Sequence, residues 1–122
     1  MMRLGLVAVL LAALVAPAQA GKPVKRTRVQ VVAEEYAFAL SRRTVYAGPA
    51  TIQLANFGED PHDLRLHRVC GTKTFSLGEV LPGSSSDLRT TLSAGRYVLW
   101  CSIADHRALG MQAQLVVKKK RR

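Results

Sequence analysis

The chain lacks several features that would place it in other classes of protein. After its first residues it has no sustained helical periodicity, no internal repeat and no internal linker. Its 122 residues are enough for one domain and too few for two. Aromatic residues make up only 6% of the chain and do not alternate with basic residues, as they do on nucleic-acid-binding surfaces. We therefore expect one non-helical domain that does not bind nucleic acid.

Only one long hydrophobic run is present, and it lies at the start. Residues 4–15 carry no charge, follow Arg3, and are followed by Pro17-Ala18-Gln19-Ala20, the small-x-small pattern that signal peptidase reads. The run is shorter than the roughly 20 residues that span a bilayer. The sequence predicts a signal peptide over 1–20, cleavage after Ala20, and a periplasmic or secreted domain over 21–122. An uncleaved membrane anchor is the alternative, and a lipoprotein is disfavoured because the residue directly after Ala20 is not a cysteine.

Acidic residues are also scarce, with 8 against 18 basic residues and a net charge of +10. Part of the excess forms tails at the two ends of the domain, over 22–28 and 118–122. Charge runs of this kind are usually solvated. They also suggest either a protein partner with an acidic docking surface or contact with an anionic membrane surface.

What is present is a series of short strand-like segments separated by Gly/Pro turns. They cover 29–38 with a turn or bulge at Glu34-Glu35, then 44–46, 50–56, 62–69, 87–92, 96–101 and 112–118, with an edge strand or turn at 75–80. This spacing predicts an all-β Greek-key sandwich of seven or eight strands. Its expected core is Val29, Val31, Ile52, Leu54, Leu64, Leu66, Leu92, Val98, Trp100, Leu115 and Val117.

One loop between two predicted strands carries unusual chemistry. Cys101, His106 and Met111 offer a thiolate, an imidazole and a thioether within eleven positions. Such a set suits copper that cycles between two oxidation states. A further histidine can come from upstream, where His62 begins a strand and His67 lies on the opposite face of the same strand. We expect His62 to point into the site and His67 to lie at the surface.

These residues carry a resemblance to a known family. With Asn56-Phe57-Gly58 and Pro61-His62 upstream and Cys101-x4-His106-x4-Met111 downstream, residues 31–118 resemble the cupredoxins, the plastocyanin/azurin-like type 1 blue copper proteins. The resemblance implies His62, Cys101 and His106 as the strong trigonal ligands of one copper ion and Met111 as the weak axial ligand. It also implies that an edge of His106 lies near the surface, beside small or apolar residues such as Ala108 and Leu109.

The function implied by the resemblance is one-electron transfer between redox partners, such as a cytochrome or an oxidase, by a monomeric carrier. Periplasmic copper handling or delivery is the alternative, although the methionine-rich or histidine-rich tracts that usually accompany copper storage are missing. Enzymatic activity is not expected, because a copper oxidase or nitrite reductase needs further copper centres and more domains.

The second cysteine offers a competing interpretation, since a disulfide between Cys70 and Cys101 would suit a small exported domain. If the strand from His62 runs away from the copper end, Cys70 lies roughly 25 Å from His62 at about 3.3 Å per residue, too far for a bridge. We therefore expect Cys70 to be an unpaired thiol.

One residue departs from the family pattern. Asp63 stands where the family often has Asn or Ser. We expect Asp63 to accept hydrogen bonds from Ser102 and to lower the reduction potential, because a carboxylate near the metal favours the more positive ion. A solvated Asp63 without influence on the site is the alternative.

Overall fold

β-Strands form all the regular secondary structure of the described residues, 12–121, in the computed structural model. There are nine of them: β1 (Thr27–Glu34), β2 (Ala37–Leu40), β3 (Thr44–Tyr46), β4 (Gly48–Asn56), β5 (His62–Arg68), β6 (Thr74–Val80), β7 (Ser85–Leu92), β8 (Gly95–Trp100) and β9 (Gln112–Lys118). The all-β prediction is confirmed. The predicted count of seven or eight is too low, because β1 and β2 are separate strands and the ambiguous segment around 75–80 is a full edge strand.

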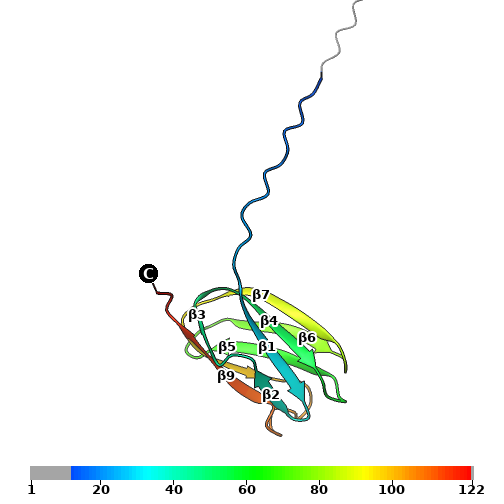
Figure 1. Ribbon diagram of the computed structural model, residues 1–122. Helices are drawn as coiled ribbons and strands as arrows, with labels where there is room; N and C mark the ends of the chain where they lie inside the picture. Colours follow the sequence, from blue (N-terminus) through cyan, green and yellow to red (C-terminus); the bar gives the residue numbers. More distant parts are fainter. Residues whose placement is uncertain (1–11, 122) are drawn as a thin grey trace, which may run out of the picture.

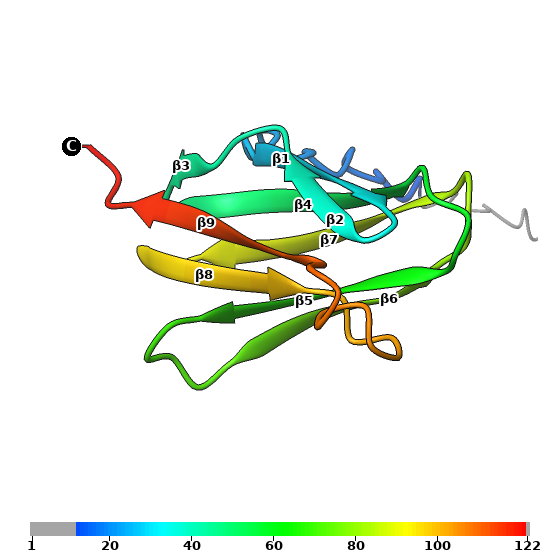
Figure 2. The same ribbon diagram turned by 90° about the horizontal axis from the view of Figure 1, so that it is seen from below.

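The strands form two mixed sheets that pack face to face (Figure 2). One sheet has the order β2-β1-β4-β7, and the other has the order β3-β9-β8-β5-β6. β1 runs parallel to β4, and β3 runs parallel to β9, while the remaining pairs are antiparallel. Two sheets arranged in this way bury one face each and leave the other face to solvent.

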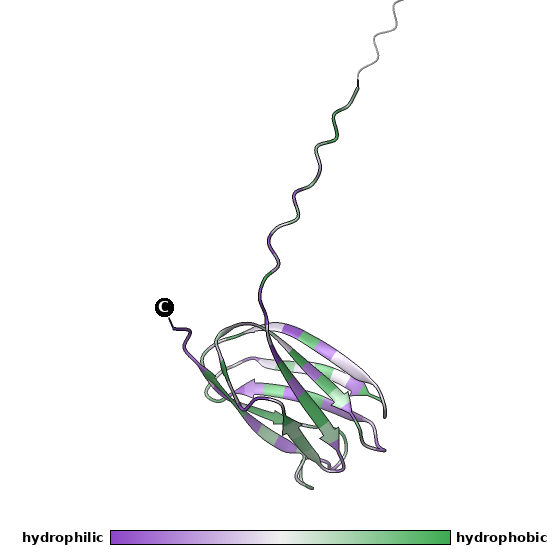
Figure 3. Cartoon of the chain, viewed as in Figure 1, coloured by the Kyte–Doolittle hydropathy of each residue, from purple (hydrophilic) through white to green (hydrophobic). Residues whose placement is uncertain are grey.

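The core follows from the period of two along each strand. In β1, Val29, Val31 and Ala33 are buried while the residues between them are more exposed, and Figure 3 shows the alternation of hydrophobic and hydrophilic residues along the strands. Nine of the eleven predicted core residues are buried: Val29, Val31, Ile52, Leu54, Leu64, Leu66, Leu92, Leu115 and Val117.

The prediction is wrong for the other two, Val98 and Trp100, which are only partly buried. The inward residues of β8 are Tyr97 and Leu99, with Cys101 next in the same alternation. Because side chains alternate along a strand, an inward-facing Cys101 places Leu99 and Tyr97 inward as well, and Val98 and Trp100 then face outward. Trp100 lies against the guanidinium of Arg107, 4.6 Å from the ring centroid.

The loops at one end of the sandwich hold the residues of chemical interest. Backbone hydrogen bonds of 2.9 Å join Phe57 to Ala33 and Gly83 to Asn56, so the β1–β2 turn and the β4–β5 and β6–β7 loops meet there. The β8–β9 loop lies at the same end, which we call the ligand end (Figure 1). The chain enters β1 at Thr27 and leaves β9 at Lys118 at the opposite end of the sandwich, which we call the tail end.

The proposed signal peptide lies mostly outside the described residues. Its first eleven positions are among those not described, and residues 12–26 are exposed and form no strand. A search of the described residues finds no helix that is long and apolar enough to cross a membrane.

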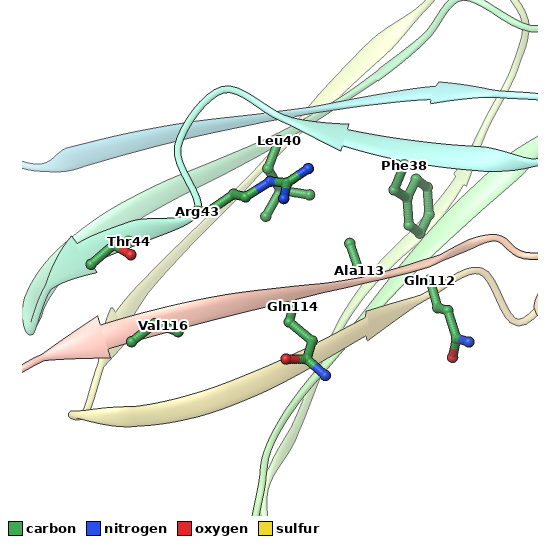
Figure 4. A pocket seen from close by; sticks show the side chains of 8 residues that line it. All are labelled: Phe38, Leu40, Arg43, Thr44, Gln112, Ala113, Gln114 and Val116. Carbon is green, nitrogen blue, oxygen red and sulfur yellow. The ribbon is translucent and has the colours of Figure 1, made fainter.

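A shallow groove separates the edges of the two sheets away from the loops. Phe38 and Leu40 of β2 and Ala113 of β9 line it, with Phe38 and Ala113 pointing toward each other across it (Figure 4). Arg43 is its only ionisable residue. The residues that line this groove include no histidine, cysteine or carboxylate, so we do not consider it as a metal or catalytic site.

The facing of β8 can be tested by comparing two neighbouring truncations. Leu99→Ala removes a side chain that is 0% exposed and should lower the free energy of unfolding by about 2–5 kcal/mol. Val98→Ala, on the outward face, should cost roughly 1 kcal/mol or less. Urea unfolding of both variants in the same metal state measures the difference, and equal losses would contradict this facing.

Candidate metal centre

Three potential metal-binding side chains converge inside the ligand end. Cys101 Sγ lies 3.9 Å from His62 Nδ1 and 3.6 Å from His106 Nδ1, and the three donor atoms all lie within 4.8 Å of one another. The three residues are buried, with His62 at 0%, Cys101 at 1% and His106 at 7% exposure. The structure therefore brings together the two histidines and the cysteine that the sequence singled out.

The ends of three strands position these side chains. His62 is the first residue of β5, Cys101 directly follows β8, and Met111 directly precedes β9. The backbone N–H of Cys101 donates to the carbonyl of Met111, and the N–H of Met111 donates to the carbonyl of His106, both at 3.1 Å. Met111 is 0% exposed. The backbone thus fixes the positions of three of the four predicted ligands within one closed loop.

A glycine is required where this loop returns to β9. Gly110 has φ +116°, a conformation that side chains with a Cβ rarely adopt. A Cβ at this position would also lie 3.4 Å from the carbonyl oxygen of Tyr36. Gly110 therefore allows the β8–β9 loop to close against the β1–β2 turn.

Asn56 organises the loop that leads to His62. Its side-chain amide donates to the carbonyls of Asp60 and Val80, at 2.8 and 2.9 Å, and its Oδ1 accepts the N–H of Gly58 at 2.8 Å. The side chain is 2% exposed, so these bonds are made away from water. Asn56 thereby holds the β4–β5 loop in the shape that delivers His62 to the site.

Glu35 binds both this loop and His62. Its Oε1 accepts the N–H groups of Glu59 and Asp60, at 2.8 and 2.7 Å, and lies 3.0 Å from His62 Nε2. The N–H of Asp60 is the main cause that holds the pKa of Glu35 below its usual value, with His62 and Glu59 adding to it. A carboxylate on Nε2 keeps the proton on that nitrogen and leaves the Nδ1 lone pair for a metal.

Asp60 and Tyr36 lie beside the other histidine. Asp60 Oδ2 lies 3.9 Å from His106 Nε2 and accepts the hydroxyl of Tyr36 at 3.1 Å. This hydrogen bond is the main cause that raises the pKa of Tyr36. The Tyr36 ring also packs against the imidazole of His106, with 4.8 Å between ring centroids.

None of these three residues is among the site residues predicted from the sequence. Glu35 and Tyr36 stand in a turn that precedes His62 by more than 25 positions, and no spacing rule connects them to it. The two acidic residues at the turn were the only available signal, since buried or loop-facing carboxylates often brace metal-bound histidines.

The expected contact between Asp63 and Ser102 is present. Asp63 Oδ1 accepts the N–H of Ser102 at 2.6 Å, and Oδ2 accepts its hydroxyl. A register shift in the β5–β6 pairing between His62 and Leu64 lets two consecutive residues, His62 and Asp63, both be buried. The alternative of a solvated Asp63 is wrong, because this residue is 5% exposed.

The remaining histidine and cysteine stay outside the site, as expected. His67 Nδ1 bonds the hydroxyl of Thr74 at 2.9 Å on the outward face of β5. Cys70 is an exposed free thiol, and Cys101 is a buried one, so the two form no disulfide.

Three loops of the ligand end each carry an exposed apolar side chain. Phe57 in the β4–β5 loop is 68% exposed, Leu109 in the β8–β9 loop is 52% exposed, and Leu81 in the β6–β7 loop is 59% exposed. Only 8% of the His106 side chain reaches solvent, because Tyr36 and the loop cover it. The ligand end therefore combines a mostly covered His106 with exposed apolar side chains in three of its loops.

The donor set fits a type 1 copper site. Two imidazole Nδ1 atoms face one sulfur in a water-poor pocket, and a fully buried methionine is adjacent in the same loop. Burial is the main cause that raises the pKa of the Cys101 thiol. A metal cation held by Cys101 would reverse that preference and favour the thiolate.

Comparisons with known proteins agree with this fold. No family model matches the chain, and no curated protein matches it. Among solved structures, reduced auracyanin from Roseiflexus castenholzii is similar with a TM-score of 0.63 and 19% identity, over 75% of this chain and 96% of its own. Auracyanin A, a "blue" copper protein from Chloroflexus aurantiacus, gives a TM-score of 0.61 and 20% identity, over 77% of this chain and all of its own.

A larger protein shares the same fold over part of its length. The copper nitrite reductase from Nitrosomonas europaea is similar with a TM-score of 0.60 and 17% identity, over 79% of this chain and 42% of its own. The chain thus has a cupredoxin-like fold, and this fold occurs both in small blue copper proteins and in copper enzymes.

The Asp63 brace can be tested with a nearly isosteric variant. Asp63→Asn keeps an acceptor for the Ser102 N–H but removes a negative charge near the metal, so the potential of the copper-loaded protein should rise by roughly 50 mV, about 1 kcal/mol for one electron. Asp105→Asn, on an exposed residue of the β8–β9 loop, is the matched control and should shift the potential less. Protein-film voltammetry measures the potentials of both variants. An unchanged potential in Asp63→Asn would show that the Asp63 carboxylate does not lower the potential.

The role of Glu35 is tested by comparison with its neighbour. Glu35→Gln removes the charge that faces His62 Nε2, and the copper potential should rise because the carboxylate favours the more positive ion. Glu34→Gln changes the same net charge on an exposed side chain and should shift the potential less. Equal shifts in the two variants would mean that Glu35 acts only through its long-range charge.

Proposed function

We propose that this chain is a type 1 copper protein that carries single electrons between redox partners. The supporting observation is the buried cluster of His62, Cys101 and His106, whose donor atoms converge beside Met111 in a cupredoxin-like fold. In this assignment, His62, Cys101 and His106 hold the metal in a trigonal plane, and Met111 is the weak axial ligand. Bound copper would supply a one-electron couple between Cu(I) and Cu(II).

The residues around the cluster suit electron transfer because they hold the ligands still. Backbone hydrogen bonds join Met111 to both Cys101 and His106. The Asp63–Ser102 and Glu35–His62 contacts tie the neighbour of Cys101 and the remaining ligand to other elements. Ligands that cannot move much keep one geometry in both oxidation states, so little reorganisation accompanies the electron. Rigid support of this kind favours a carrier over a metal donor.

Burial of the ligands also argues against copper delivery, the alternative function. A protein that hands its ion to a recipient must let the recipient's ligands reach the metal. Here His62 and Met111 are 0% exposed and Cys101 is 1% exposed. Four donors around one ion also leave no open position for a substrate, so we propose that the chain is not an enzyme.

The surface around His106 is the proposed site of electron entry and exit. The loops at the ligand end carry the exposed apolar side chains of Phe57, Leu81 and Leu109, which suit brief docking of a redox protein such as a cytochrome or an oxidase. We propose that the carrier acts as a monomer. We also propose that residues 1–20 direct export to the periplasm or the exterior, on the basis of the apolar run and the Ala18-Gln19-Ala20 pattern.

The colour of the copper-loaded protein provides the direct test. Cu(II) bound to the Cys101 thiolate should give an intense blue protein that loses its colour reversibly on mild reduction. Cys101→Ser should abolish the colour, whereas Cys70→Ser should leave it, because Cys70 is exposed and outside the cluster. Visible absorption spectroscopy measures this. A colourless protein that binds Cu(I) tightly would instead favour copper handling.

A further inference from the structure

The charged residues are segregated along the long axis of the sandwich. Of the eight carboxylates, all but Asp87 lie in the loops of the ligand end or on strand residues next to them: Glu34, Glu35, Glu59, Asp60, Asp63, Glu79 and Asp105. The long basic runs of the sequence lie at the opposite end, where both chain ends leave the sandwich (Figure 1). The chain is therefore an electric dipole with a strongly positive tail end.

The structure adds a feature that the sequence did not indicate, because six basic residues line one groove at the tail end. Three separate segments supply its cationic lining: Lys25, Arg26, Arg28, Arg42, Lys120 and Arg121. The nearest opposing carboxylate is Asp87, 3.6 Å from Arg28. One such carboxylate is too few to neutralise the groove, so most of its positive charge faces solvent.

We propose that the tail end binds an anionic lipid surface. Each Lys or Arg near such a surface strengthens binding, and here the local charge and the net charge of +10 act in the same direction. This proposal goes beyond electron transfer and does not depend on copper.

Two observations favour lipid over an acidic protein as the partner. Five of the six cations, all but Arg28, lie on chain segments outside the strands, where no strand pairing fixes their spacing for a complementary protein surface. Exposed apolar side chains also stand among the cations: Val24 is 64% exposed and Tyr46 is 47% exposed. Tyrosine is the kind of side chain that settles at the level of lipid headgroups.

Binding in this way directs the metal centre away from the lipid. The eight residues of β1 span about 26 Å at roughly 3.3 Å each, which exceeds two Debye lengths of about 10 Å at 0.1 M salt. The carboxylates at the ligand end therefore do not weaken the attraction at the tail end, and they disfavour the reverse orientation. A redox partner could then reach His106 while the protein stays on the surface.

Co-sedimentation of the full mature chain with vesicles tests the binding. Vesicles of phosphatidylglycerol and phosphatidylcholine should bind the metal-free protein, and pure phosphatidylcholine vesicles should not. Arg42→Gln/Arg121→Gln should weaken binding about 25-fold, at about five-fold per cation. Arg89→Gln/Arg107→Gln removes the same net charge outside the groove and should weaken it less than about five-fold.

Two results would overturn the proposal. Equal weakening by the two double variants would mean that net charge alone attracts the protein, without a defined surface. Absence of vesicle binding, together with salt-sensitive binding to an acidic polymer such as polyglutamate, would mean that the groove serves an acidic macromolecule instead. Because the protein is metal-free in both arms, neither result bears on the copper assignment.

The orientation has its own readout, because the chain contains a single tryptophan. Trp100 lies at the ligand end, at the last position of β8. Nitroxide-labelled headgroup lipids should leave Trp100 fluorescence unquenched on binding. They should quench the reporter in Trp100→Phe/Tyr46→Trp, since Tyr46 lines the basic groove. Quenching of Trp100 would show that the ligand end is the bound face and would refute the proposed orientation.

Discussion

The approach of one sulfur to two imidazole nitrogens in a dry pocket is the constraint on which the rest of this structure depends. Cys101 Sγ must face inward, so β8 turns Tyr97 and Leu99 into the core and Trp100 outward. His62 must face the same point, and the register shift at the start of β5 allows it to do so while Asp63 also turns inward. Two strands from the same sheet thus adopt facings that a hydrophobic pattern alone would not require.

The sequence was sufficient for the parts of the site that share a local pattern. The cysteine, histidine and methionine of one loop, the strand-end position of His62 and the alternation within β5 all follow from spacing along the chain. The prediction of which β8 residues face inward was wrong because Val98 and Trp100 are as hydrophobic as the true inward residues. Composition alone could therefore not decide between the two faces of the strand. Including Cys101 in the alternation would have decided it.

Glu35, Tyr36 and Asp60 were out of reach for a different reason. They join the site only because β1 pairs with β4, which brings a turn and a loop from distant parts of the chain together. Both imidazoles consequently face a carboxylate on the side away from the sulfur, at 3.0 Å for His62 and 3.9 Å for His106. This arrangement couples the electrostatics of the site to residues outside the ligand loop, and Gly58 preserves it because any side chain there would clash with Glu35.

The backbone bond from Cys101 to Met111 has a consequence for how such a protein can evolve. It continues the β8–β9 ladder one step beyond the pair Trp100 and Gln112, so the intervening loop is an insertion with anchored ends. The exposed residues between the ligands, Gly110 apart, can be exchanged without unpairing the hairpin. Descendants of one scaffold could therefore acquire different reduction potentials through changes in a single short loop, while selection on folding acts mostly on the strands.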